Sequence, residues 1–143
     1  MYDVIVIGVG GKGSAVLFHV ARRAARVLGL EQFDIPNELG SSHGLTRMIR
    51  LAYWEDPAYV PLLRRAYELW RELEHLAGES LLFTTGSIDA GAPDGRPVRG
   101  VLEACDRFDL PHNTLDAREL SRRFPGYRLP SSLVATTSLT VAS

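Results

Sequence analysis

The first thirty-one residues alternate apolar runs with polar or glycine-rich positions, and this pattern predicts three secondary-structure elements. Residues 2–7 form a β-branched run, which is typical of a strand buried on both faces. Residues 12–26 are amphipathic, with apolar positions at three- and four-residue steps, as a helix requires. Residues 27–30 are apolar again and end at Glu31. The pattern therefore predicts a strand, a glycine turn, a helix that begins at residue 12 or 13, and a second strand.

The turn after the first strand carries glycine at four positions: Gly8, Gly10, Gly11 and Gly13. Gly8 lets the chain turn sharply, and Gly10 removes the side chain that would keep a pyrophosphate off the backbone. Gly13 lets the helix pack closely on the strand. The free N–H groups of the first helical turn and the helix dipole both favour a phosphate there. This order predicts a dinucleotide-binding fingerprint. The alternative is a glycine turn in some other α/β domain.

Glu31 stands at the end of the second predicted strand, eighteen residues beyond Gly13. An acid at this place in the fingerprint can accept the hydroxyls of an adenosine ribose, and it would repel a 2′-phosphate. The residues therefore predict FAD or NAD as the ligand and argue against NADP.

A polar segment follows at residues 41–50, after a loop marked by Pro36 and Gly40. It places hydroxyls, an imidazole and two guanidiniums beside a flexible glycine, a composition suited to anion contacts and proton handling. The alternative is an ordinary polar loop that enters a strand or a helix. The candidate functional residues of this segment are Ser42, His43, Thr46, Arg47 and Arg50.

The middle of the chain predicts a long helix followed by short strands. Asp56 before Pro57 is typical of a helix start, and apolar residues then recur with helical spacing until Gly78. Residues 81–90 predict two short strand pieces on either side of Gly86.

Two shorter helices are predicted toward the end of the chain. Residues 98–108 form the first, and Cys105 on it is interpreted as a packing residue rather than a nucleophile. Asp116 and Glu119 have the spacing of a capping box and predict a second helix, which stops before Pro125.

Composition narrows the class of protein. The chain has 143 residues, 45% of them apolar, and a formal net charge of -1. These values describe a globular protein with no charge excess for a nucleic acid or an anionic membrane. One cysteine cannot form an intramolecular disulfide, the first predicted strand leaves no room for a signal peptide, and no apolar stretch reaches the length of a membrane span. We therefore expect a cytoplasmic protein without a metal site.

Positions 8–15, 26–34 and 40–50 together resemble the FAD-dependent amine oxidases of the monomeric sarcosine oxidase and N-methyltryptophan oxidase family. Positions 59–62 and 68–74 are also similar to that family, so the resemblance runs to about residue 135. It implies FAD rather than NAD. It also implies oxidation of the secondary amine of a small amino-acid substrate to an imine, with dioxygen giving hydrogen peroxide.

The resemblance also assigns roles to individual residues. It implies that His43 and Arg47 lie against the flavin, where a cation stabilises the anionic reduced ring. It implies that Arg50 holds the substrate carboxylate and that Glu31 is the ribose acid. Lys12 departs from the usual apolar residue of the family, and two interpretations stay open: it adds a cation near the phosphates, or it points to water. The expected cofactor contacts are Gly8, Gly10, Gly11, Lys12, Gly13, Glu31, Gln32, Ser42, Thr46 and Arg47.

The predicted fold class is α/β: a Rossmann-like FAD-binding βαβ unit followed by helices and the start of a mixed α+β substrate domain. We expect the FAD-binding part at residues 1–80, the beginning of the substrate domain at 81–135 and an atypical tail at 136–143. Members of the family are more than twice as long, so the chain is expected to be a truncated fragment that is inactive alone and that self-associates through an open sheet edge. The alternatives are an inactive dinucleotide-binding module and part of an NAD-dependent dehydrogenase.

Overall fold

The computed structural model of the chain describes residues 1–23, 26–138 and 140–142. The chain forms two compact units, residues 1–45 and residues 46–143. Both contain strands and helices, which confirms the mixed α/β class. The predicted division at residue 80 stays a prediction.

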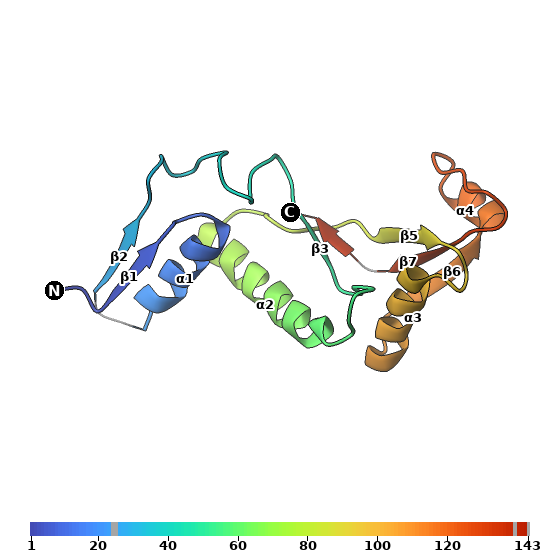
Figure 1. The fold of residues 1–143 in the computed structure, drawn as a ribbon, viewed down its shortest axis with the longest axis horizontal. Coiled ribbons are helices and arrows are strands. Elements are labelled where there is room, and N and C mark those ends of the chain that lie inside the picture. The colour runs from blue at the N-terminus through green and yellow to red at the C-terminus, as the bar shows by residue number, and fades with distance from the viewer. Residues whose placement is uncertain (24–25, 139, 143) are drawn as a thin grey trace. The chain divides into compact units, whose positions relative to one another are not determined.

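The first unit is the predicted βαβ arrangement. Strand β1 (Val4–Ile7) pairs in parallel with β2 (Val27–Leu30), and helix α1 (Gly11–Ala21) connects them. Helix α1 packs on one face of the two strands (Figure 1), where a Cβ on Gly29 would lie 2.6 Å from Leu17 Cδ1. The predicted order of strand, glycine turn, helix and strand is therefore confirmed.

The prediction that the first strand is buried on both faces is wrong. Ile5 and Ile7, which alternate with the half-buried Val4 and Val6, are 53% and 85% exposed. The reason is that α1 covers one face of a sheet of two strands, and successive side chains of a strand point to opposite faces. The β-branched run predicted the strand correctly but not what covers it.

Helix α1 also ends earlier than predicted, at Ala21 instead of near residue 26. The N–H of Arg23 donates to the Val20 carbonyl at 2.9 Å, a tighter bond of the kind that closes a last helical turn. Further on, the Arg26 N–H donates to an Asp3 carboxylate oxygen at 3.0 Å, and the Arg26 carbonyl accepts from the Asp3 N–H at 2.9 Å. Arg26 is thus held beside the start of β1 and not in the helix. Residues 24 and 25 of the predicted helix lie outside the described residues.

The second unit contains two antiparallel sheets of three strands, with orders β3-β8-β4 and β5-β7-β6. Its elements in chain order are β3 (Met48–Arg50), α2 (Tyr59–Ala77), β4 (Phe83–Thr84), β5 (Ser87–Gly91), α3 (Arg96–Phe108), β6 (His112–Asp116), α4 (Ala117–Arg123), β7 (Val134–Ser138) and β8 (Thr140–Ala142).

The predicted helices and short strands of this unit are present. Helix α2 begins at Tyr59, two residues after Pro57, because residues 56–59 form a turn in which Asp56 accepts the Ala58 N–H at 2.8 Å. It ends at Gly78, whose φ of 70° is a left-handed conformation that favours glycine. Strands β4 and β5 flank Gly86 as predicted.

Strands β6 and β7 were not predicted. The segment at residues 136–143 supplies the end of β7, the central strand of its sheet, and then β8, the central strand of the other. Residues 139 and 143 of that segment lie outside the described residues.

Helices α3 and α4 cover opposite faces of the β5-β7-β6 sheet (Figure 1). Leu120 of α4 packs with Leu115 and Ala135 on one face. On the other face, Val98 of α3 lies 3.2 Å from the place where a Cβ on Gly91 would stand. A second cluster consists of Ala52, Val60, Val101, Ala104, Cys105 and Leu110.

Cys105 is a packing residue, as predicted. Its side chain is buried in that second cluster. Burial raises the pKa of the thiol to about 11, with smaller contributions from the negative charges of Asp106 and Asp89. At neutral pH the thiol is protonated, which disfavours nucleophilic chemistry.

Two further findings concern the described part of the chain. None of its helices is long and apolar enough to cross a membrane. Its His, Cys, Asp and Glu side chains form no group of three that could hold a metal ion.

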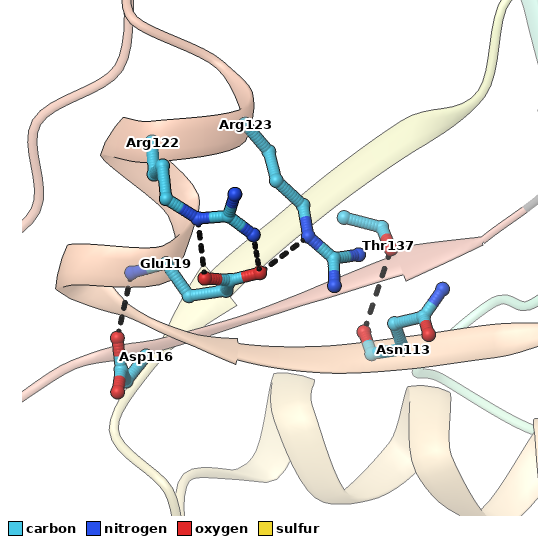
Figure 2. Close-up of polar contacts among 6 residues, drawn as sticks. All are labelled: Asn113, Asp116, Glu119, Arg122, Arg123 and Thr137. Atoms are coloured by element: carbon cyan, nitrogen blue, oxygen red, sulfur yellow. Dashed lines mark hydrogen bonds and ion pairs between the residues drawn. The ribbon is translucent and has the colours of Figure 1, made fainter.

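The N-cap half of the predicted capping box forms at the start of α4. Asp116 accepts the Glu119 N–H at 2.7 Å, and this bond satisfies one of the free donors of the first helical turn (Figure 2). The Glu119 carboxylate instead contacts the two arginines that follow it, so the return bond of the box to the Asp116 N–H is not among the described contacts. Arg122 donates to both Glu119 oxygens at 3.0 and 2.8 Å, and Arg123 donates to one of them at 2.6 Å.

The contacts of Glu119 with the two arginines lead to a prediction about its pKa. The hydrogen bonds from Arg122 and then Arg123 lower the pKa of Glu119 from 4.5 to about 2. A lowered carboxyl pKa stabilises the fold above the ordinary value, and the contribution is lost as the pH falls from 4.5 toward 2. We expect an NMR titration to place the Glu119 midpoint near 2 and the Arg122→Ala variant to raise it. An equal Glu119 midpoint in the unmodified protein and in Arg122→Ala would contradict the prediction.

Candidate dinucleotide-binding site

The site is built on the close approach between the start of α1 and the end of β1. A Cβ on Gly13 would overlap the Gly8 carbonyl oxygen, so the helix can begin here only because residue 13 has no side chain. Gly8 has a φ of 88°, a conformation that side-chain-bearing residues rarely adopt, and its N–H donates to the Leu30 carbonyl at 2.8 Å. The sharp turn at Gly8 and the close approach at Gly13 are the local features that the sequence predicted, and the Gly8 hydrogen bond joins the turn to the end of β2.

The N-terminus of α1 is suited to an anion. The first helical hydrogen bond runs from the Ser14 N–H to the Gly10 carbonyl at 2.9 Å, so the amides before Ser14 have no acceptor within the helix. The first turn of α1 contains no acidic side chain, and Lys12 adds a positive charge to it. These donors and the positive end of the helix dipole favour a phosphate group.

Glu31 follows β2 directly and contacts the glycine turn. Its Oε2 accepts the Val9 N–H at 2.7 Å, while Oε1 accepts the N–H groups of Gln32 at 2.8 Å and Phe33 at 3.4 Å. The bond from Val9 and then that from Gln32 lower the pKa of Glu31, against a smaller opposing effect of burial. The carboxylate is thus ionised at neutral pH and stands beside the phosphate-binding turn.

The glycine turn, the end of β2 and the loop after it enclose a pocket of about 740 Å³. Ser42 closes one side, since its Oγ lies 2.6 Å from the place where a Cβ on Gly11 would stand. Eight of the ten predicted cofactor contacts line this one pocket: Gly8, Gly10, Gly11, Lys12, Gly13, Glu31, Gln32 and Ser42.

Several other lining residues were not predicted. Phe33, Asn37, Leu39 and Ser41 come from the loop between β2 and residue 42. Their signal in the sequence was only that they lie between the predicted ribose acid and the predicted polar segment. A loop with proline and glycine shows that the chain turns there, but it does not show which side chains face inward.

The residues present fit a dinucleotide. The pocket lies within the usual range of about 300–1,000 Å³ for small-molecule sites. The turn supplies free backbone donors for a pyrophosphate, and the absence of a side chain at Gly10 leaves the space in front of them open. A carboxylate has about four acceptor positions, of which Glu31 uses three, one of them in a long bond. An adenosine ribose hydroxyl can therefore still donate to Glu31.

The remaining candidates lie at or beyond the end of the first unit. Residues 41–46 are non-helical, and Gly44 has a φ of 108°. His43 contacts the Gly40 carbonyl through Nδ1 at 2.7 Å. Thr46 and Arg47 belong to the second unit, where Arg47 donates to the Thr46 carbonyl at 2.7 Å. Their predicted contacts with the cofactor stay predictions.

Arg50 lies on β3 and has a partner that the sequence did not reveal. Its Nη1 donates to Asp89 Oδ1 at 3.1 Å, and its guanidinium stacks 4.8 Å from the centre of the Tyr53 ring. The Arg50 and Asp89 side chains are 23% and 14% exposed, so the ion pair is largely shielded. The one signal for Asp89 was an acid inside a short predicted strand, where acids are uncommon.

A parallel βαβ unit with a glycine turn at a helix N-terminus and an acid at the end of β2 defines a dinucleotide-binding protein. The model of the FAD-dependent oxidoreductase family matches residues 3–142, and the chain belongs to this family. FAD rather than NAD is thus the cofactor of the family, as predicted.

Two relatives within this family are similar in sequence to the chain. The chain is 52% identical over 124 residues to the monomeric sarcosine oxidase of Streptomyces avermitilis, a match that covers 87% of this chain and 32% of the relative. It is 35% identical over 134 residues to the N-methyl-L-tryptophan oxidase of Yersinia pestis, covering 94% of this chain and 36% of the relative. It thus spans about a third of the length of these relatives.

A solved structure shows the same fold. The open form of NikD, an unusual amino acid oxidase essential for nikkomycin biosynthesis, is similar with a TM-score of 0.86 and 31% identity. The match covers 99% of this chain and 37% of NikD.

Two glycine variants separate the roles of the turn. Gly13→Ala should disrupt the first unit because the new Cβ would overlap a backbone oxygen. Gly10→Ala should leave the fold intact, because a Cβ there meets nothing within 4 Å, but its methyl group should lower the affinity for ADP about tenfold or more. Amide NMR spectra would report the fold, and calorimetry would report ADP binding. Unchanged ADP affinity in Gly10→Ala would place the pyrophosphate elsewhere.

Proposed function

We propose that this chain is the FAD-binding part of a flavin-dependent oxidase that converts secondary amino-acid amines to imines. The substrates would be of the sarcosine or N-methyltryptophan type, and dioxygen would be reduced to hydrogen peroxide. The observation that carries the proposal is the pocket around the glycine turn, which gathers the predicted dinucleotide contacts in a chain 52% identical to a monomeric sarcosine oxidase.

The proposed division of labour within the pocket follows from charge and hydrogen-bonding capacity. The amides at the start of α1 would hold the pyrophosphate, and Lys12 would add a screened positive charge beside it. Glu31 would accept a ribose hydroxyl. Gln32 and Ser42, which line the same pocket, would contact the adenosine half and the phosphate side respectively. FAD, when bound, supplies the acceptor for the two electrons that leave the amine.

The roles proposed for the later residues concern the reacting groups. Arg47 would place a positive charge where negative charge develops during oxidation, and His43 would contact the same region through its ring. Arg50 would hold the substrate carboxylate. A guanidinium carries five N–H donors, and the Asp89 hydrogen bond uses one of them, so Arg50 can bind a carboxylate while Asp89 and Tyr53 keep its plane fixed.

A second candidate function is a dinucleotide-binding module without turnover. The observation that favours it is that the chain spans about a third of its relatives, whereas oxidation needs all reacting groups assembled in one place.

In either case we propose a cytoplasmic protein, because the one cysteine is buried and unpaired. We also propose self-association through the first unit, where β1 and β2 each have an open edge and Ile5 and Ile7 are exposed.

A first test concerns the ligand and turnover of the chain itself. We expect the purified 143-residue protein to bind FAD and ADP but to show no peroxide production from sarcosine above that of free FAD. Flavin fluorescence would follow binding, with NADP as the ligand that the Glu31 carboxylate should exclude. Tight binding of NAD without FAD would favour the dehydrogenase alternative, and turnover would refute the inactive module.

A second test separates the two arginines. In a chimaera in which this chain replaces the matching third of the Streptomyces avermitilis enzyme, Arg50→Ala should mainly raise KM for sarcosine, by about tenfold or more. Arg47→Ala should mainly lower kcat, because its proposed contact is with the flavin. Arg65→Ala, which removes an exposed ion pair on α2, is the control. Equal effects of the first two variants on KM alone would show a single anion clamp.

A further inference from the structure

Glu31 makes a hydrogen bond that contact with a ribose does not require. The N–H groups of Gln32 and Phe33 come from its own neighbours in the chain, and their bonds to Oε1 are local. The N–H of Val9 comes from a residue twenty-two positions away and donates to the other oxygen, Oε2, at 2.7 Å. The carboxylate therefore joins the end of β2 to the glycine turn after β1.

The hydrogen bond from Val9 to Glu31 lies just beyond the last paired residues of β1 and β2. Strands β1 and β2 pair up to Ile7 and Leu30, and the Gly8 N–H still reaches the Leu30 carbonyl at 2.8 Å. At Val9 the backbone pairing has ended, and the Glu31 side chain supplies the next acceptor. The turn is thus held against β2 one residue further than the backbone alone holds it.

We infer that Glu31 is a positioning residue for the glycine turn, which it holds in the phosphate-binding form before any ligand is present. This inference rests on the proposed dinucleotide function and adds a second role to the ribose contact. A turn that is already ordered loses less conformational freedom when it binds, and this raises affinity for the phosphate part of the ligand as well as for the ribose. The lowered pKa of Glu31 agrees with a carboxylate that accepts backbone hydrogen bonds.

A carboxylate is needed for this role because its two oxygens act in two directions. In Glu31→Gln one oxygen becomes an NH₂ group, which would face a backbone N–H as a donor against a donor. In Glu31→Asp the charge remains but the side chain is shorter by one methylene, so it should no longer reach Val9.

Electrostatics and positioning predict opposite results for inorganic pyrophosphate, which has no ribose. If Glu31 acted only as a nearby negative charge, its neutralisation would strengthen binding of the anion. If Glu31 positions the turn, neutralisation weakens binding. Glu38→Gln removes the same charge from the exposed loop that follows β2 and measures the charge effect alone.

The experiment compares the 143-residue protein with Glu31→Gln, Glu31→Asp and Glu38→Gln. Calorimetry would measure the affinity for pyrophosphate and for ADP, and NMR would measure hydrogen exchange of the Val9 amide without ligand. Amides of the paired strands β1 and β2 would report in the same sample whether the first unit is folded. We expect the Val9 amide to exchange about tenfold faster in both Glu31 variants, and pyrophosphate to bind severalfold more weakly in both than in Glu38→Gln.

The other possible results each overturn either the role inferred for Glu31 or the proposed function. Weaker ADP binding with unchanged or tighter pyrophosphate binding in Glu31→Gln would reduce Glu31 to a ribose ligand and overturn the inference. If the unmodified chain binds neither ADP nor pyrophosphate, the proposed cofactor function fails. Val9 exchange then decides separately whether Glu31 holds the turn: acceleration supports it and an unchanged rate overturns it.

Discussion

The first unit depends on how closely the start of α1 can approach the end of β1. Because residue 13 has no Cβ, the helix begins directly against the Gly8 carbonyl, and its N-terminal amides open into the space beside the turn. Any side chain at this position would push the helix away from the strand and turn its dipole from the pocket. The direction of the anion-binding amides follows from this steric condition, and a second glycine, Gly11, leaves the room that Ser42 occupies at the side of the pocket.

The two units are stabilised in different ways. Among the described residues, the buried hydrophobic side chains all belong to the second unit: Ala52, Val60, Leu82, Val98, Val101, Ala104, Cys105, Leu110, Leu115, Leu120 and Ala135. The first unit has a helix on one face of two strands, so it gains less from apolar burial. Hydrogen bonds between side chains and the backbone therefore contribute a larger share of the stability of the first unit. Asp3 holds the Arg26 N–H at one end of the strands, and Glu31 holds the Val9 N–H at the other.

The sequence predicted the features that depend on local chemistry. The glycine turn, the end of α2 at Gly78 and the N-cap at Asp116 each require particular residues at short spacing, and each formed as expected. The strands β6 and β7 were missed because residues 112–116 and 134–138 show little apolar alternation. They are strands because each pairs with a distant segment, and such pairing leaves no local signal. The burial of Ile5 was wrongly predicted for the same reason. An apolar run shows that a strand face can be buried, but it does not show which distant element covers that face.

A carboxylate fixes the position of a candidate residue both in the dinucleotide pocket and at Arg50, and the physical reason is the same in each place. Glu31 fixes a backbone amide, and Asp89 fixes the guanidinium of Arg50, in each case through an acceptor with a defined direction. Asp89 also neutralises Arg50, so the pair exerts little long-range attraction on an anion. A substrate carboxylate would then be selected by the geometry of the donors that remain on Arg50 and not by net charge.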